Sequence, residues 1–79
     1  MNLTNYKAYI TLQAVKSGIR APQLIAENTG VAYKTTLNYL HYYECRGIIR
    51  GDGLNRYKIT SMGKIVLSIM NELVRIEED

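Results

Sequence analysis

The stretch PQLIAENTGVAYKTTLNYLHYYECRG, residues 22–47, contains the signals that decide the fold. Its proline suits the first turn of a helix, because the missing N–H would have no partner there. A helix is predicted over 21–28, with Gly30 as the residue that ends it. After the turn Thr29-Gly30-Val31, a longer helix is predicted over 32–46 and is stopped by Gly47. The centre of the chain therefore reads as two helices joined by a tight turn.

The flanking sequence adds a helix before this pair and a hairpin and a helix after it. The further predicted elements are a helix, two short strands and a last helix, over residues 3–17, 48–50, 56–60 and 61–77. The glycine-rich segment 51–55 separates the strands as a turn. Alternation along the second strand turns Tyr57 and Ile59 inward and leaves Arg56 and Lys58 outward. Thr60 or Ser61 is expected to cap the last helix.

Apolar residues at helical spacing indicate which faces of these helices are buried. The positions expected to face inward are Leu3, Tyr6, Ile10 and Ala14 in the first helix, with Leu12 and Val15 beside them, Leu24 and Ile25 in the second, and Thr36, Leu40 and Tyr43 in the third.

With 79 residues the chain is near the lower limit for a domain that folds alone. Its single cysteine, Cys45, excludes an internal disulfide, and one histidine, His41, leaves a Cys/His zinc site short of ligands. We therefore expect no metal and no cofactor, and support from a partner chain. The unpaired thiol suits a reducing compartment, and neither a signal peptide nor a membrane span is visible. A cytoplasmic protein without a membrane partner is expected.

The net charge of +3 is unevenly distributed. Residues 1–71 carry +6, whereas residues 72–79 carry −3. A basic body with an acidic end favours a polyanionic partner for the body.

Three segments, in this order and at these separations, form a fairly specific pattern: Leu24 to Val31, Leu40 to Ile49, and Tyr57 to Gly63. Together they resemble the winged helix-turn-helix regulators of bacteria and archaea, of the MarR-like and PadR-like kind. The resemblance is greater to the small archaeal and archaeal-virus members with a helical C-terminal dimerisation arm, and it covers nearly the whole chain.

The resemblance implies a mainly α fold with a two-stranded β wing, in the order α-α-α-β-β-α. Residues 1–60 would form the winged helix-turn-helix body, and residues 61–79 the C-terminal helix of the same domain. It also implies sequence-specific or semi-specific binding of double-stranded DNA, transcription regulation and a nucleoid-associated location. Where the family often has several arginines on its recognition helix, this chain has Lys34 and then tyrosines.

In such docking the start of the recognition helix enters the major groove, where base edges can be read. The residues expected at the DNA are Ala32, Tyr33, Lys34, Thr35, Asn38, Tyr39 and Tyr42. Asn38 can pair with adenine, and Lys34 can reach guanine or a phosphate. For Tyr39 and Tyr42, covering the core is an equal alternative, and for Tyr43 it is the preferred interpretation.

Polar and basic residues of the hairpin are expected on the DNA backbone or in the minor groove. These wing residues are Arg50, Asn55, Arg56 and Lys58. Arg20 and Gln23, near the start of the second helix, are expected on backbone phosphates. The alternative is an ordinary charged edge that discourages strand aggregation.

The last helix contains a short heptad seam typical of a coiled coil. We expect a homodimer whose interface contains Met62, Val66, Ile69, Met70, Leu73, Val74 and Ile76. Ile65 and Leu67 widen the apolar stripe beyond what one packing surface needs. The alternative is a monomer that buries one face of this helix against its own body.

An enzyme is not expected. His41 and Cys45 are four residues apart on one helical face, but a solvated imidazole and a half-buried thiol explain them better than a catalytic pair. The segment Gly51-Asp52-Gly53 lacks the lysine and the helix of a phosphate-binding loop, and no small-molecule ligand is expected. The competing function is a winged helix used for protein contacts, which the tyrosine content favours.

Overall fold

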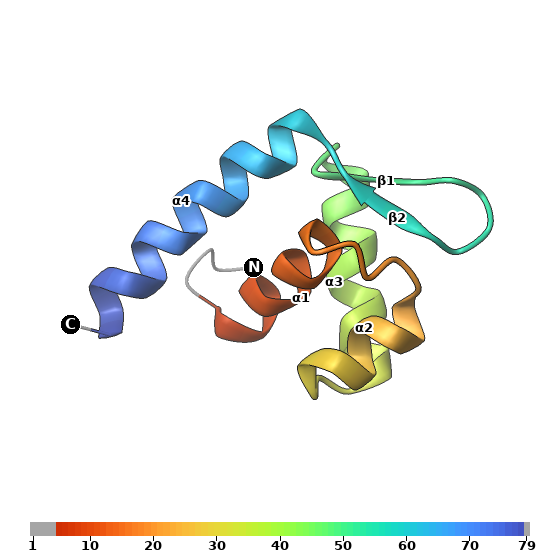
Figure 1. Cartoon of the computed structure of the whole chain (residues 1–79), viewed down its shortest axis with the longest axis horizontal. Coiled ribbons are helices and arrows are strands. Elements are labelled where there is room, and N and C mark those ends of the chain that lie inside the picture. Colours follow the sequence, from red (N-terminus) through yellow and green to blue (C-terminus); the bar gives the residue numbers. More distant parts are fainter. Residues whose placement is uncertain (1–4, 79) are drawn as a thin grey trace.

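The computed structural model describes the backbone of residues 5–78 and the side chains of residues 5–75. Its elements are α1 (Tyr6–Lys16), α2 (Pro22–Thr29), α3 (Tyr33–Cys45), β1 (Ile49–Gly51), β2 (Tyr57–Ile59) and α4 (Ser61–Glu78). This mainly helical order with one antiparallel hairpin confirms the predicted succession of elements. In Figure 1, α1 lies at the centre, the hairpin projects to the right, and α4 extends to the lower left.

Helix α1 begins later than predicted because Asn5 caps it. The Asn5 side-chain oxygen accepts hydrogen bonds from the N–H groups of Lys7 and Ala8, at 3.0 and 3.4 Å. The predicted inward face was also wrong, since Tyr6 is exposed and Ile10 only half-buried. The buried residues of α1 are Ala8, Thr11, Leu12, Ala14 and Val15. Of the predicted face, Ala14 alone is buried, and Leu3 lies outside the described residues.

The turn between α2 and α3 depends on Thr29 and Gly30. The Thr29 hydroxyl donates to the carbonyl of Ile25 at 2.8 Å and accepts from the N–H of Val31 at 3.2 Å. Gly30 ends α2 with φ of 76°, a left-handed conformation that suits a residue without Cβ. Ile25 is fully buried as predicted, but Leu24 is exposed, so α2 buries a narrower face than its sequence indicated.

The hairpin has a defined register in which Ile49 faces Ile59 and Arg50 faces Lys58. Both strands are three residues long, and β1 starts one residue later than predicted. Tyr57 is buried and Lys58 exposed, which confirms the predicted alternation. Because Arg50 and Lys58 are paired and exposed, the outward face of the hairpin carries two cations side by side.

The first turn of α4 is fixed to the end of α3 through Thr60. Its hydroxyl donates toward the carbonyls of Gly47 and Ile48, at 2.6 and 2.9 Å, and accepts from the N–H of Gly63 at 3.0 Å. Thr60 is therefore the capping residue. A Cβ at Gly63 would overlap the Ile48 carbonyl and lie 2.7 Å from Cγ1 of Ile59, so only glycine allows this approach.

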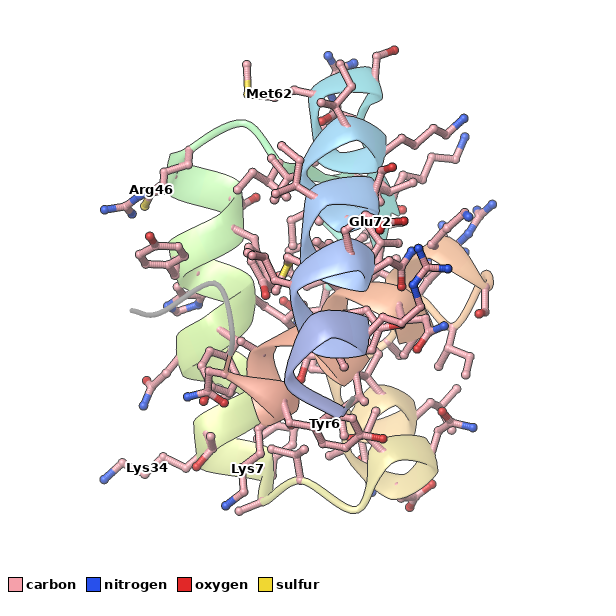
Figure 2. All side chains as sticks on the ribbon, turned by 90° about the vertical axis from the view of Figure 1, so that its left-hand side faces the viewer. Tyr6, Lys7, Lys34, Arg46, Met62 and Glu72 are labelled. Carbon is pink, nitrogen blue, oxygen red and sulfur yellow. The ribbon has the colours of Figure 1, made fainter. Side chains whose placement is uncertain are left out.

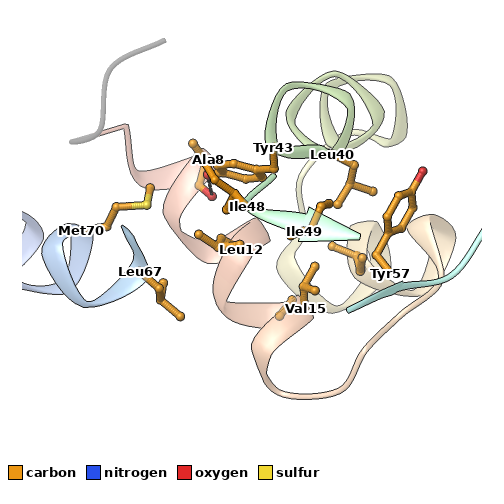
Figure 3. Packing of buried hydrophobic residues seen from close by; sticks show 12 residues of the cluster. Ala8, Leu12, Val15, Leu40, Tyr43, Ile48, Ile49, Tyr57, Leu67 and Met70 are labelled. Atoms are coloured by element: carbon orange, nitrogen blue, oxygen red, sulfur yellow. Dashed lines mark hydrogen bonds between the residues drawn. The ribbon is translucent and has the colours of Figure 1, made fainter. Parts of the chain in front are cut away.

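The core lies between α1, α2, α3, the hairpin and the part of α4 up to Met70 (Figure 3). Its fully buried large side chains are Tyr43, Leu12, Ile25, Leu40, Ile49, Leu67, Met70, Thr11 and Thr36. The two threonines are satisfied locally, because each hydroxyl donates to the carbonyl four residues earlier. The core thus holds one side of α3 and one side of α4 against α1, and leaves their other sides at the surface.

Candidate nucleic-acid interface

Helix α3 presents one row of polar side chains to the solvent. Lys34, Asn38, His41 and Cys45 follow the 4-3-4 spacing of one helical face, and all four are exposed. They point away from Thr36, Leu40 and Tyr43, the residues that α3 buries. We call these four residues the α3 stripe. His41 and Cys45 therefore extend the surface that was predicted from Lys34 and Asn38, and their own spacing from Asn38 could have shown it.

The start of α3 has no side chain that caps it. Ala32 occupies the N-cap position, and its methyl group cannot accept a hydrogen bond from the first N–H groups. Ala32 and Tyr33 are exposed, and Thr35 is half-buried. These N–H groups and the positive end of the helix favour an anion at this point.

The tyrosines of α3 divide into one core residue and two that cover it. Tyr43 is fully buried, and its hydroxyl donates to the carbonyl of Ala8 at 2.6 Å. Burial raises the pKa of Tyr43, with smaller contributions from Tyr39 and Tyr42. Both of these neighbours are half-buried against the core. The structural interpretation is thus confirmed for Tyr43 and favoured over a groove contact for the other two.

Arg46 covers the ring of Tyr42 from the solvent side. Its guanidinium carbon lies 3.7 Å from the ring centroid, within the range of a cation–π contact. An edge of the Tyr43 ring approaches the same Tyr42 ring at a centroid distance of 5.9 Å. Tyr42 is therefore in contact with both neighbours and is half-buried. Arg46, which was not among the residues predicted from the sequence, is an exposed cation at this end of α3.

Asp52 organises the hairpin loop. Its carboxylate accepts hydrogen bonds from the N–H of Leu54 at 2.8 Å and of Arg56 at 3.3 Å, and pairs with Nε of Arg56 at 3.0 Å. The Leu54 N–H is the main cause of a lowered pKa at Asp52. Asn55, at the exposed loop, has φ of 56°. Arg56 thus leaves the loop with one side of its guanidinium already paired.

Four predicted backbone-binding cations surround one hollow at the hairpin. Arg20, Arg50, Arg56 and Lys58 line it together with Gly51, Asp52 and Tyr57. Arg20 is held there because its carbonyl accepts the N–H of Tyr57 at 3.0 Å, which ties the α1–α2 linker to β2. Arg50 and Lys58 are opposite each other on the two strands. Like charges in this arrangement are destabilising, so this pair weakens the hairpin and favours an anionic ligand.

Gln23, predicted beside Arg20, belongs to another part of the surface. It lines a hollow with Ala26, Glu27 and Tyr33, between α2 and the start of α3. The predicted DNA residues therefore form two groups in the described part of the chain. Gln23 lies with the start of α3, while Arg20 lies with the hairpin cations.

The predicted dimer residues of α4 differ in how deeply they are buried. Met70 is fully buried and Val74 nearly so, both in the core of their own chain, together with Leu67. These two residues are thus not exposed for a partner, contrary to their place in the predicted interface. Val66 and Leu73 are half-buried, and the side chain of Ile76 lies outside the described residues.

The outward apolar face of α4 consists of Met62, Ile65 and Ile69, with about half or more of each side chain exposed. Met62 marks the upper end of this helix in Figure 2, which shows α4 in front of α1. We call these three residues the α4 apolar face. Ile65, named only as widening the seam, is its most exposed member.

Other features of the described residues bear on alternative functions. His41 and Cys45 are exposed, and no three His, Cys, Asp or Glu side chains in the described part come close enough to hold a metal ion. Within the same residues, no helix combines the length and the apolar character that crossing a membrane requires.

Comparison with known proteins found no matching family model, no matching curated protein and no matching solved structure.

Proposed function

We propose that this chain is a winged helix-turn-helix protein that binds double-stranded DNA as a homodimer and regulates transcription. Helix α3 would enter the major groove, and the hairpin loop with Asn55 and Arg56 would contact the backbone or the minor groove. The observation that carries the proposal is the α3 stripe. It combines a side chain able to pair with adenine, Asn38, and a cation, Lys34, on an exposed helix whose start has no capping side chain.

The size of the major groove supports this arrangement, because it admits one α-helix. A groove-binding helix needs polar groups on one side and firm packing on the other. Helix α3 has both, since Leu40 and Tyr43 are fully buried opposite the stripe. Sequence preference is therefore expected to depend on Asn38, and affinity on Lys34 and Arg56.

Selection of bound duplexes from a random pool tests this proposal. The wild-type protein is expected to enrich a pseudo-palindromic site, and Asn38→Ala is expected to lose the preference at one adenine in each half-site. A good bidentate contact discriminates by about 1–3 kcal/mol, or roughly ten- to a hundredfold. Lys7→Ala, which removes an exposed cation at the start of α1, is the control and should enrich the same site. Enrichment that is identical in Asn38→Ala would contradict the assignment of α3.

The homodimer is proposed through the α4 apolar face. The described residues leave about half or more of each of its side chains exposed, and an exposed apolar patch commonly marks a contact with another chain. Sedimentation equilibrium tests this: wild type is expected as a dimer, and Ile65→Lys as a monomer. Ser68→Lys, an exposed position on the polar side of the same helix, should remain dimeric. A monomeric wild type, or a dimeric Ile65→Lys, would refute the interface.

If the protein binds no duplex at all, the function as a protein-interaction module becomes the better explanation. The exposed Tyr33 and the hollow that it lines with Gln23 would then be the place to search.

A further inference from the structure

A second group of cations lies on the outer side of β2. Lys16 at the end of α1, Arg20 in the linker, Lys58 in β2 and Lys64 in the first turn of α4 line one hollow of about 430 Å³. Its remaining lining residues are Val15, Gly18 and Ile59, so no acidic side chain of the described residues lines it. We call the four cations the α1–β2–α4 basic surface. Neither Lys16 nor Lys64 was predicted as a functional residue.

The position of Lys64 is unfavourable for the protein by itself. The N-terminus of a helix carries a partial positive charge, which favours acidic side chains and disfavours cations. The first turn of α4 contains no acidic residue, and it carries Lys64 instead. Lys58 adds its own charge beside this helix end, in a further hollow that it shares with Arg50, Thr60 and Ser61. A bound anion would relieve the mutual repulsion of these charges.

This basic surface and the α3 stripe face different sides of the molecule. Lys58 alternates with Tyr57 and Ile59, whose side chains turn toward the core. The α3 stripe also points away from the core, but from the α3 side. In Figure 2, Lys34 and Arg46 extend to the left beyond α3, while the orange linker between α1 and α2 lies on the right. A duplex with α3 in its groove and Arg56 on its backbone would therefore leave Lys16 and Lys64 open for a second ligand.

We propose that the α1–β2–α4 basic surface binds the phosphate backbone of a second DNA duplex, so that the protein bridges two duplexes. The inference rests on the proposed function, because the first duplex is held by the α3 stripe. The second surface consists of four long cationic side chains around a shallow hollow. The other residues that line this hollow are Val15, Gly18 and Ile59, whose side chains carry no polar group. Such a surface suits phosphates, which need charge rather than base reading.

A capture assay tests the bridging. One duplex is immobilised on beads, the protein is added, and the amount of a second, fluorescent duplex retained on the beads is measured. Binding of a single duplex is measured in parallel by fluorescence anisotropy. Wild type is expected to retain the second duplex, whereas Lys16→Ala/Lys64→Ala should retain about tenfold less, because each lost lysine removes roughly one phosphate contact. Its binding of a single duplex should stay within about threefold of wild type, on the same estimate.

The matched control is Lys7→Ala/Arg75→Ala, which also removes one cation from α1 and one from α4 but outside the basic surface. It should retain the second duplex like wild type. Retention that persists in Lys16→Ala/Lys64→Ala would overturn the inference, because the two α3 surfaces of a dimer would then explain bridging. If wild type binds a single duplex but retains no second duplex on the beads, the bridging inference is overturned and the proposed function is not. Absence of binding in both measurements would overturn the proposed function as well.

Discussion

Replacing Lys58 by glutamate tests the register of the hairpin and the reason for its charges together. Arg50 and Lys58 are directly opposite each other and both exposed, so their like charges oppose strand pairing. Lys58→Glu converts this pair into opposite charges. We therefore expect the variant to be more stable than wild type and to bind less DNA.

The magnitude follows from the exposure of the pair. A cross-strand pair of opposite charges contributes roughly 0.2–1 kcal/mol, and exposed ion pairs rarely exceed about 1 kcal/mol. Adding the relief of repulsion, we expect about 0.5–1 kcal/mol, which corresponds to a rise in Tm of roughly 2–8 °C for a domain of this size. Thermal unfolding at low salt measures it. The gain should disappear near 1 M salt, where the screening length is about 3 Å.

A double-mutant cycle isolates the pair from the change in net charge. Arg50→Glu alone should also stabilise, and Arg50→Glu/Lys58→Glu should lose both gains because like charges again face each other. Additive effects of the two single hairpin variants, or a gain that persists near 1 M salt, would contradict a repulsion between Arg50 and Lys58.

Three further predictions concern packing and the hairpin loop. Gly63→Ala should lower the free energy of unfolding by about 1–3 kcal/mol in urea titrations, because the alanine methyl group would overlap the carbonyl of Ile48. Alanine favours helices over glycine by about 1 kcal/mol, so a variant more stable than wild type would contradict this close approach. Tyr43→Phe should lower the free energy of unfolding by about 1 kcal/mol, because it loses the hydrogen bond to the carbonyl of Ala8. Tyr42→Phe should lower it by less than about half of that. Equal losses would contradict the assignment of Tyr43 as the core residue and Tyr42 as a residue that covers it. The lowered pKa of Asp52 means that its contribution is complete above its ordinary pKa and is lost as pH falls through the lowered value; the pH dependence of unfolding should lose this component in Asp52→Asn.

The order of elements could be predicted because each boundary has a local chemical signal. Gly30 in the left-handed conformation ends α2, and Pro22 begins it. The alternation of Tyr57 and Lys58 fixes which face of the hairpin is inward. These signals depend on neighbouring residues alone, so they can be read from the sequence without knowing the tertiary structure.

The buried faces of the helices were harder to predict, because α1 and α4 contain more apolar residues than one face can hold. In α1 a face centred on Leu12 is buried instead of the one that includes Tyr6. In α4, Leu67 and Met70 are buried, whereas Ile65 is exposed. Both patterns have helical spacing, and only the position of the neighbouring helix decides between them.

The candidate site could be predicted only in part from the sequence. The spacing of Lys34 and Asn38 on α3 predicts a shared face, and their exposure agrees with it. The assembly of Lys16 and Arg20 with Lys58 and Lys64 was not predictable, because the first two residues lie far before the other two in the sequence. It depends on the hydrogen bond that ties the linker to β2 and on the packing of α4 beside α1.

The most direct test of DNA binding is a titration of the purified protein against a labelled mixed-sequence duplex at several salt concentrations. If a dimer neutralises on the order of six phosphates, the logarithm of the binding constant should fall with the logarithm of salt concentration with a slope of about −5. We expect a slope of that size for wild type and a smaller slope for Lys34→Ala/Arg56→Ala. No detectable binding at a salt concentration of about 50 mM would contradict it.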